Sequence, residues 1–155
     1  RAGIEVVTAG VEDKVLIGAH SIKIEMDKRV DEVNSSDFDM IVLPGGLPNA
    51  FTLADDNDVQ RLLKEFEEKN KKIGAICAAP YALHKAGVLN QNYTCYPSFE
   101  KKIKDDGYQD DKNVVTDNNV ITSRGPATAI DFALEIVKTL KGDDIYFQVK
   151  TGLLA

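Results

Sequence analysis

The sequence lacks tryptophan, has only two histidines and two cysteines, and contains no apolar run near the roughly 20 residues that a membrane-spanning helix needs. We therefore expect a water-soluble protein. The cysteines, Cys77 and Cys95, form no CxxC pair, and no histidine lies at metal-ligand spacing from either. We predict two free thiols, no metal and no cofactor. Free thiols and the lack of a secretory signal pattern favour a reducing, cytoplasmic location.

The sequence also has fewer basic residues than acidic residues. The formal net charge is -6 and the pI is near 4.9, which opposes binding to a polyanion. The one basic cluster, Lys69, Lys71 and Lys72, lies at a predicted helix end, where capping and solvation explain it. Nucleic acid is thus disfavoured as a primary partner.

The hydrophobic pattern alternates between buried strands and crossover helices over 155 residues, a length that suits one domain. Apolar runs predict parallel strands at 39–43 and 72–76, and amphipathic spacing predicts helices at 57–69, 78–86 and 126–140. One hairpin is predicted around Gly18, and a second pairs residues 114–116 with residues 120–122. A polar helix is predicted at 98–106, and a last helix at about 143–151. This order predicts a doubly wound α/β fold with three layers in a single domain, 1–155.

The start of the chain has a pattern of its own. Arg1-Ala2-Gly3 resembles the last turn of a helix and its terminal glycine, and residues 4–9 follow as a β-branched strand. We therefore expect a further helix before Arg1.

Cys77 is the candidate nucleophile. It joins a predicted strand to a predicted helix, where the partial positive charge of a helix start favours thiolate. Ligands bind beyond the carboxyl ends of strands in such sheets, so the Pro44-Gly45-Gly46 loop is expected to face it. The amides of Gly46 and Ala78 would then converge on an oxyanion. A free cysteine after an apolar strand is, however, also typical of a buried core residue.

A histidine base for this thiol is hard to find. His84 lies seven residues along the predicted helix, roughly 10 Å away at 1.5 Å per residue, and His20 lies in the early hairpin. We interpret both as surface or structural residues. The sequence thus offers no conventional base.

Three motifs carry a resemblance to a known family. The chain resembles the DJ-one/ThiJ/PfpI superfamily, closest to its DJ-one branch, through the sequences Leu43-Pro44-Gly45-Gly46, Ile76-Cys77-Ala78-Ala79-Pro80 and Thr122-Ser123-Arg124-Gly125-Pro126. This resemblance implies a flavodoxin-like homodimer with Cys77 on a nucleophile elbow. It also implies activity on small aldehydes or glycated groups, as a glutathione-independent glyoxalase or protein deglycase. The alternatives are an oxidative-stress sensor or chaperone using the same cysteine, and a cysteine peptidase or amidotransferase. The last would need a histidine where Ala78 stands.

The resemblance assigns further residues, and the chain departs from it in two places. Family members carry an acid/base glutamate on an N-terminal segment, and this chain does not show that segment. Glu5 and Glu25 are poor substitutes for that glutamate. We therefore expect a segment from outside these residues to complete the site. Tyr96 stands where several relatives have histidine, and it is expected to line the pocket, since tyrosine, with a reference pKa of about 10, does not act as a neutral-pH base. Arg124 is a candidate anion contact or a loop-ordering residue, and Cys95 is expected to be structural.

Overall fold

A central sheet of four strands organises the computed structural model, which describes residues 1–103 and 106–155. The strand order is β5 (Met40–Leu43), β6 (Lys72–Ile76), β8 (Val120–Ser123) and β7 (Val114–Asp117). The pairs β5–β6 and β6–β8 are parallel, and β7 joins β8 antiparallel, with Asp117 opposite Val120. The predicted strands at 39–43 and 72–76 and the predicted pairing of 114–116 with 120–122 are confirmed.

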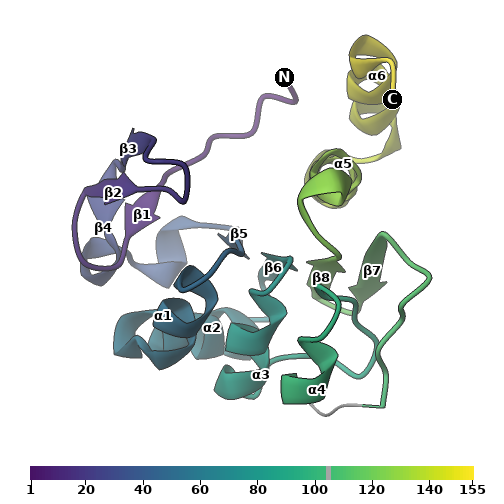
Figure 1. Cartoon of the computed structure of the whole chain (residues 1–155). Coiled ribbons are helices and arrows are strands. Elements are labelled where there is room, and N and C mark those ends of the chain that lie inside the picture. Colours follow the sequence, from purple (N-terminus) through teal and green to yellow (C-terminus); the bar gives the residue numbers. More distant parts are fainter. Residues whose placement is uncertain (104–105) are drawn as a thin grey trace.

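Helices cover both faces of this sheet (Figure 1). α1 (Asn49–Asp55), α2 (Asn57–Glu68) and α3 (Pro80–Ala86) lie on one face, and α5 (Ala129–Lys141) lies on the other, with α6 (Asp143–Leu153) packed on α5. The short helix α4 (Glu100–Ile103) lies within the predicted 98–106 helix, of which residues 104 and 105 fall outside the described residues. The three-layer, flavodoxin-like α/β fold predicted from the sequence is therefore observed. Among the described residues, each helix is too short or too polar to cross a membrane.

The main core lies between the sheet and helices α2 and α3. Leu62, Leu63, Phe66, Ile73 and Leu83 are each at most 1% exposed. Asp56 caps the start of α2, because its carboxylate accepts a hydrogen bond from the Val59 amide at 2.9 Å.

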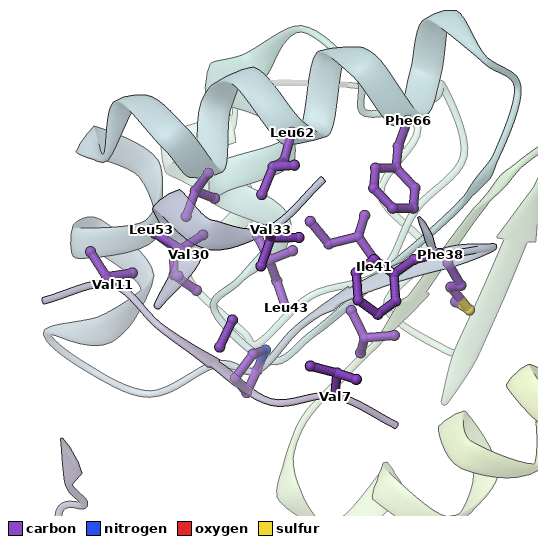
Figure 2. Close-up of a pocket in the computed structure, with 15 residues that line it drawn as sticks. Val7, Val11, Val30, Val33, Phe38, Ile41, Leu43, Leu53, Leu62 and Phe66 are labelled. Carbon is purple, nitrogen blue, oxygen red and sulfur yellow. The ribbon is translucent and has the colours of Figure 1, made fainter. Parts of the chain in front are cut away.

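An apolar cavity borders this core on the outer side of β5 (Figure 2). Its labelled lining residues come from the N-terminal segment, β5, α1, α2 and the chain between β4 (Lys28–Arg29) and β5. This cavity does not include Cys77 in its lining.

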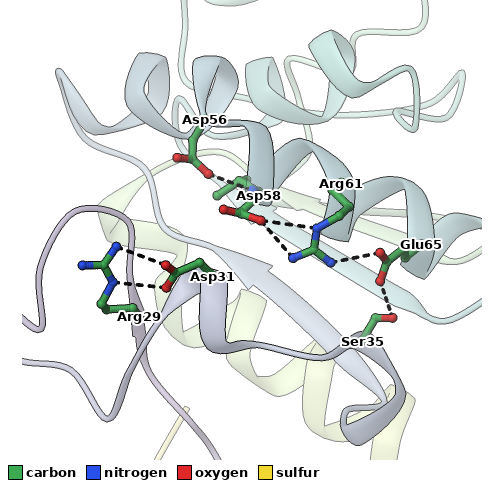
Figure 3. A network of polar contacts seen from close by, with 8 residues as sticks. Arg29, Asp31, Ser35, Asp56, Asp58, Arg61 and Glu65 are labelled. Atoms are coloured by element: carbon green, nitrogen blue, oxygen red, sulfur yellow. Dashed lines mark hydrogen bonds and ion pairs between the residues drawn. The ribbon is translucent and has the colours of Figure 1, made fainter.

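The outer side of α2 is polar (Figure 3). Arg61 bridges Asp58 at 3.0 Å and Glu65 at 2.9 Å, and Ser35 donates a hydrogen bond to Glu65 at 2.6 Å. The hydrogen bond from Ser35 and then that from Arg61 lower the pKa of the Glu65 carboxyl. These contacts tie the loop before β5 to α2, although exposed ion pairs of this kind stabilise a fold little.

Helical spacing in the predicted helix at 126–140 favours a buried face formed by Ile130, Ala133, Leu134, Val137 and Leu140, and this prediction is partly wrong. Leu134 and Val137 are buried as expected, but Ile130 is 54% exposed and Ala133 is also exposed. Phe132 is buried instead, because Gly74 on β6 leaves room for its ring: a Cβ atom added at Gly74 would lie 3.1 Å from the Phe132 Cζ atom. The first turn of α5 is thus rotated relative to the predicted face.

The predicted strand at residues 4–9 is also largely absent. Only β1 (Ala9–Gly10) forms, and it pairs in parallel with β4. Residues 4–8 are not part of a strand, and Val6 is 73% exposed, although the Thr8 carbonyl accepts a hydrogen bond from the Lys28 amide of β4 at 3.0 Å. The predicted hairpin around Gly18 does form, from β2 (Val15–Ile17) and β3 (Lys23–Glu25).

Truncation of the core is expected to cost much of the stability. Leu63→Ala should lower the free energy of unfolding by about 2–5 kcal/mol, because Leu63 is fully buried and the resulting cavity cannot fill. Denaturant titration measures this change. Leu153→Ala is the matched control on a half-exposed leucine, for which a change of no more than about 1 kcal/mol is expected. Equal losses in the two variants would contradict the assigned core.

Candidate active site

Cys77 occupies a sharp turn between β6 and α3. Its φ angle is +65°, in the left-handed region that residues other than glycine adopt at a cost of order 1–3 kcal/mol. Residues 77–79 form the turn, and α3 begins at Pro80 rather than at Ala78 as predicted. Such strain persists only where surrounding contacts impose it, and it is typical of nucleophile elbows.

Hydrogen bonds on both sides hold this turn. The Cys77 amide donates to the Ser123 carbonyl at 2.9 Å, which continues the β6–β8 ladder past the strand end. The Cys77 carbonyl accepts from the Tyr96 amide at 2.8 Å. The Cys77 backbone is thus fixed between the end of β8 and the 93–97 segment, while its side chain stays partly exposed.

The Gly45-Gly46 loop lies directly against the elbow. A Cβ atom added at Gly45 would lie 2.6 Å from the Cys77 Cβ, 2.8 Å from the Ile76 carbonyl oxygen and 3.0 Å from the Ala78 nitrogen. Any side chain at Gly45 would therefore displace the elbow. Gly46 has a φ of +92°, so it turns the chain away towards α1.

Asn49 fixes this loop, a role that the sequence analysis missed. Its side-chain amide donates to the Pro44 carbonyl at 3.1 Å and to the Gly45 carbonyl at 3.0 Å. An amide residue just after a Pro-Gly-Gly turn is a signal for this kind of clamp.

Tyr96 and Arg124 come from the two segments that hold the elbow. Tyr96 is 47% exposed, and its ring lies 3.4 Å from a Cβ atom added at Gly125. Arg124 is half-buried at the end of β8, and its charge opposes the burial that raises the pKa of Tyr108. The structure thus places the predicted residues Gly45, Ala78, Tyr96 and Arg124 at the carboxyl edge where Cys77 stands.

A buried hydroxyl cluster supports the Arg124 loop and was also missed. The Ser123 and Thr128 hydroxyls lie 2.7 Å apart, and the Thr128 Oγ1 atom accepts from the Gly125 amide at 3.1 Å. Ser123 and Thr128 are at most 9% exposed. Because the Ser123 carbonyl holds the Cys77 amide, this cluster positions the elbow indirectly.

Cys95 differs from Cys77 in its exposure to solvent. Its side chain is fully buried, next to Ala78 and Phe99 in an apolar cluster. Burial, followed by the nearby charge of Glu100, raises the pKa of the Cys95 thiol to about 12. A thiol of this kind is inert at neutral pH, which agrees with the structural role predicted for Cys95.

The two histidines and the two glutamates considered in the sequence analysis are not among the residues described above around Cys77. His84 lies on α3, half-buried, and His20 is exposed in the turn of the β2–β3 hairpin. Glu5 and Glu25 are exposed on the N-terminal segment and on β3. Within residues 1–103 and 106–155, groups of three or more side chains able to hold a metal ion are also absent.

Comparison with known proteins identifies the family of this chain. The family model described as "DJ-1/PfpI family" matches residues 1–139. Protein dj-1beta of Drosophila melanogaster is 41% identical over 157 residues, which cover 99% of this chain and 84% of that protein. The glutathione-independent glyoxalase DJR-1.2 of Caenorhabditis elegans is 38% identical over 145 residues, which cover 93% of this chain and 77% of that protein.

Solved structures have the same fold as this chain. The crystal structure of Drosophila melanogaster DJ-1beta superposes with a TM-score of 0.93 at 40% identity, covering 99% of this chain and 84% of that one. The structure titled "Toxoplasma gondii DJ-1, oxidized" superposes with a TM-score of 0.92 at 32% identity, with the same coverage of 99% and 84%.

Proposed function

The chain belongs to the DJ-1/PfpI family, and from this premise we propose that it is a cysteine-dependent enzyme that detoxifies reactive carbonyl compounds. The activity would be that of a glutathione-independent glyoxalase or a protein deglycase. The observation that carries the proposal is the partly exposed Cys77 on a left-handed turn, in direct contact with the Gly45 loop. The relative from Caenorhabditis elegans, which is named a glutathione-independent glyoxalase, supports the substrate class.

In the proposed reaction, the Cys77 thiolate attacks the aldehyde carbon of methylglyoxal. A C–S bond forms, the carbonyl electron pair moves to oxygen, and that oxygen takes up a proton to give a hemithioacetal. A base then removes the proton from the former aldehyde carbon and returns it to the adjacent carbon, while the hydroxyl proton of the hemithioacetal moves to the ketone oxygen, which leaves a lactoyl thioester. Water hydrolyses the thioester to lactate and regenerates the thiol. A deglycase reaction would begin with the same attack, on an aminocarbinol adduct.

The surrounding residues have defined roles in this proposal. The backbone amides of Gly46 and Ala78 stabilise the developing oxyanion, an interaction that contributes about 3 kcal/mol per donor in other enzymes. Tyr96 lines the substrate pocket, with a phenol that can donate a hydrogen bond. Arg124 at the end of β8 attracts the carboxylate of the acid product.

The residues named in the preceding paragraph do not include a base for the proton transfer between the two carbons. Glu5 and Glu25 are exposed on elements remote from the elbow in sequence, and a tyrosine such as Tyr96 is not a conventional general base. We therefore assign this role to a carboxylate carried by polypeptide outside the 155 residues. This partner segment was already expected from the family pattern, and it stays a prediction.

The test of this function is product formation from labelled substrate. When the complete protein is incubated with carbon-13-labelled methylglyoxal in the absence of glutathione, nuclear magnetic resonance is expected to show labelled lactate. Heat-denatured protein gives the background rate. Unchanged methylglyoxal beside native protein would rule out the glyoxalase activity.

A second function uses the same cysteine without turnover. The partial exposure of Cys77 favours a redox sensor, in which peroxide oxidises the thiolate to sulfenic acid and then to sulfinic acid. The related Toxoplasma gondii structure is titled as an oxidized form, which supports this alternative. A peptidase or amidotransferase is less favoured, because Ala78 stands where those enzymes need a histidine. The homodimer and the cytoplasmic location also stay predictions.

A further inference from the structure

Asn49, the first residue of α1, holds two successive carbonyl groups of the loop that faces Cys77. Its side-chain nitrogen carries two hydrogens, and it donates to the Pro44 carbonyl at 3.1 Å and to the Gly45 carbonyl at 3.0 Å. Helix capping does not account for this side chain, because the N-cap of α1 is Pro48 and no side chain of a described residue caps that helix. The Asn49 amide is therefore committed to the loop.

These two hydrogen bonds fix the direction of two peptide groups. The bonds that join Pro44 to Gly45 and Gly45 to Gly46 are trans, so the C=O and the N–H of each peptide group point in opposite directions. Because Asn49 holds both carbonyl oxygens on its own side, the N–H groups of Gly45 and Gly46 point away from it. Adjacent N–H groups that share a direction form a concavity suited to an anionic oxygen.

The peptide group between Gly45 and Gly46 is one that rotates easily when it is not held. Neither flanking residue has a side chain to hinder rotation, and Gly46 has a φ of +92°. The Gly46 carbonyl is held separately, because it accepts a hydrogen bond from the Ala50 amide at 2.9 Å. A substitution of Asn49 should therefore release the peptide group between the two glycines and leave the start of α1 in place.

We propose that Asn49 is a positioning residue, which keeps the Gly46 N–H directed at the oxygen that becomes negative when Cys77 attacks a carbonyl. The closeness of the loop to the elbow supports this assignment, since a Cβ atom added at Gly45 would lie 2.6 Å from the Cys77 Cβ. The hydrogen bond to the Gly45 carbonyl also polarises the peptide group and strengthens its N–H as a donor. The inference rests on the proposed function, because it concerns an amide that acts in that reaction.

The kinetic test is Asn49→Asp in the complete protein. Aspartate has the shape of asparagine, but its ionised carboxylate has no hydrogen to donate and repels the two carbonyl oxygens. The kcat for lactate formation is expected to fall about 30-fold with KM changed less than about threefold, because the lost contact is made in the transition state. Asn49→Ala, which removes the donor without adding a charge, should have a similar effect on kcat.

Asn90→Asp is the matched control for this substitution. The Asn90 side chain also donates to a backbone carbonyl, that of Asp117 at 2.7 Å. Asp117 pairs with Val120 at the amino end of β8, whereas Cys77 lies at the carboxyl end of the sheet. The kcat of Asn90→Asp should stay within about threefold of the parent value, because this change leaves the oxyanion donors in place.

Nuclear magnetic resonance tests the orientation of the Gly46 amide without turnover. A nuclear Overhauser contact between the Gly46 amide proton and the Cys77 side chain is expected in the complete parent protein and in Asn90→Asp. The same contact should be lost in Asn49→Asp, because the released peptide group no longer holds its N–H towards the elbow. Circular dichroism verifies that each variant is folded.

Three results would overturn the inference. The first is a contact between Gly46 and Cys77 that persists in both Asn49 variants, and the second is an unchanged kcat in a folded Asn49 variant of an active parent. The third is a rise in KM at constant kcat, which would assign Asn49 to substrate binding. An inactive parent protein would instead refute the proposed function, and the Gly46 contact would still decide whether Asn49 orients the peptide group.

Discussion

Cys77→Ser is expected to lower the rate of lactate formation from methylglyoxal at least about 10³-fold, equivalent to about 4 kcal/mol of transition-state stabilisation. The serine hydroxyl fits the elbow, but it forms an oxyanion at neutral pH far less readily than a thiol forms a thiolate. The C–S bond of the hemithioacetal then cannot form. Steady-state kinetics of the complete protein measures this loss, and circular dichroism verifies that the variant is folded.

Cys95→Ala is the matched control for this substitution. It also removes one thiol, but Cys95 is fully buried, and burial raises its pKa to about 12. The turnover rate per folded molecule should stay within about threefold of the parent protein. If Cys77→Ser retained the parent rate, or if Cys95→Ala lost as much activity, the nucleophile would be wrongly assigned.

Gly45→Ala is expected to reduce turnover about 100-fold while Cys77 itself is unchanged. The added methyl group would lie 2.6 Å from the Cys77 Cβ and 2.8 Å from the Ile76 carbonyl oxygen, so the loop or the elbow must move. Displacements of about 1 Å at a reacting group cost about this factor in rate. The effect should fall on kcat, because the geometry of attack changes.

The control for this variant is a glycine with free space around it. A Cβ atom added at Gly152 on α6 meets nothing within 4 Å, so Gly152→Ala should leave the rate unchanged and stabilise the helix slightly. Normal turnover in a folded Gly45→Ala variant would show that contact between the loop and the elbow is not required.

The sequence was most informative where one local pattern determines the structure. Apolar runs located β5 and β6, and α3 ends at Ala86 as predicted, where Gly87 with a φ of +74° terminates the helix. The Gly45 loop and Cys77 were predicted to meet because the carboxyl ends of parallel strands share one edge, and the structure confirms this contact.

The sequence was least informative where distant residues decide the outcome. The rotation of α5 depends on the space that Gly74 leaves for Phe132, which helical periodicity alone does not contain. The strand predicted at residues 4–9 has the right composition, but strands form only when a partner is paired beside them. Asn49 and Thr128 act through contacts with backbone groups, for which hydrophobic patterns give no signal.

The central claim, that Cys77 is the one reactive thiol of the site, is tested most directly by mapping thiol alkylation in the native protein. Iodoacetamide at pH 8, followed by peptide mass spectrometry, is expected to modify Cys77 and to leave Cys95 unmodified until denaturant is added. With a pKa of about 12, the Cys95 thiolate fraction at pH 8 is only about 10⁻⁴. Equal modification of the two cysteines, or an unmodified Cys77 in the folded protein, would contradict the account.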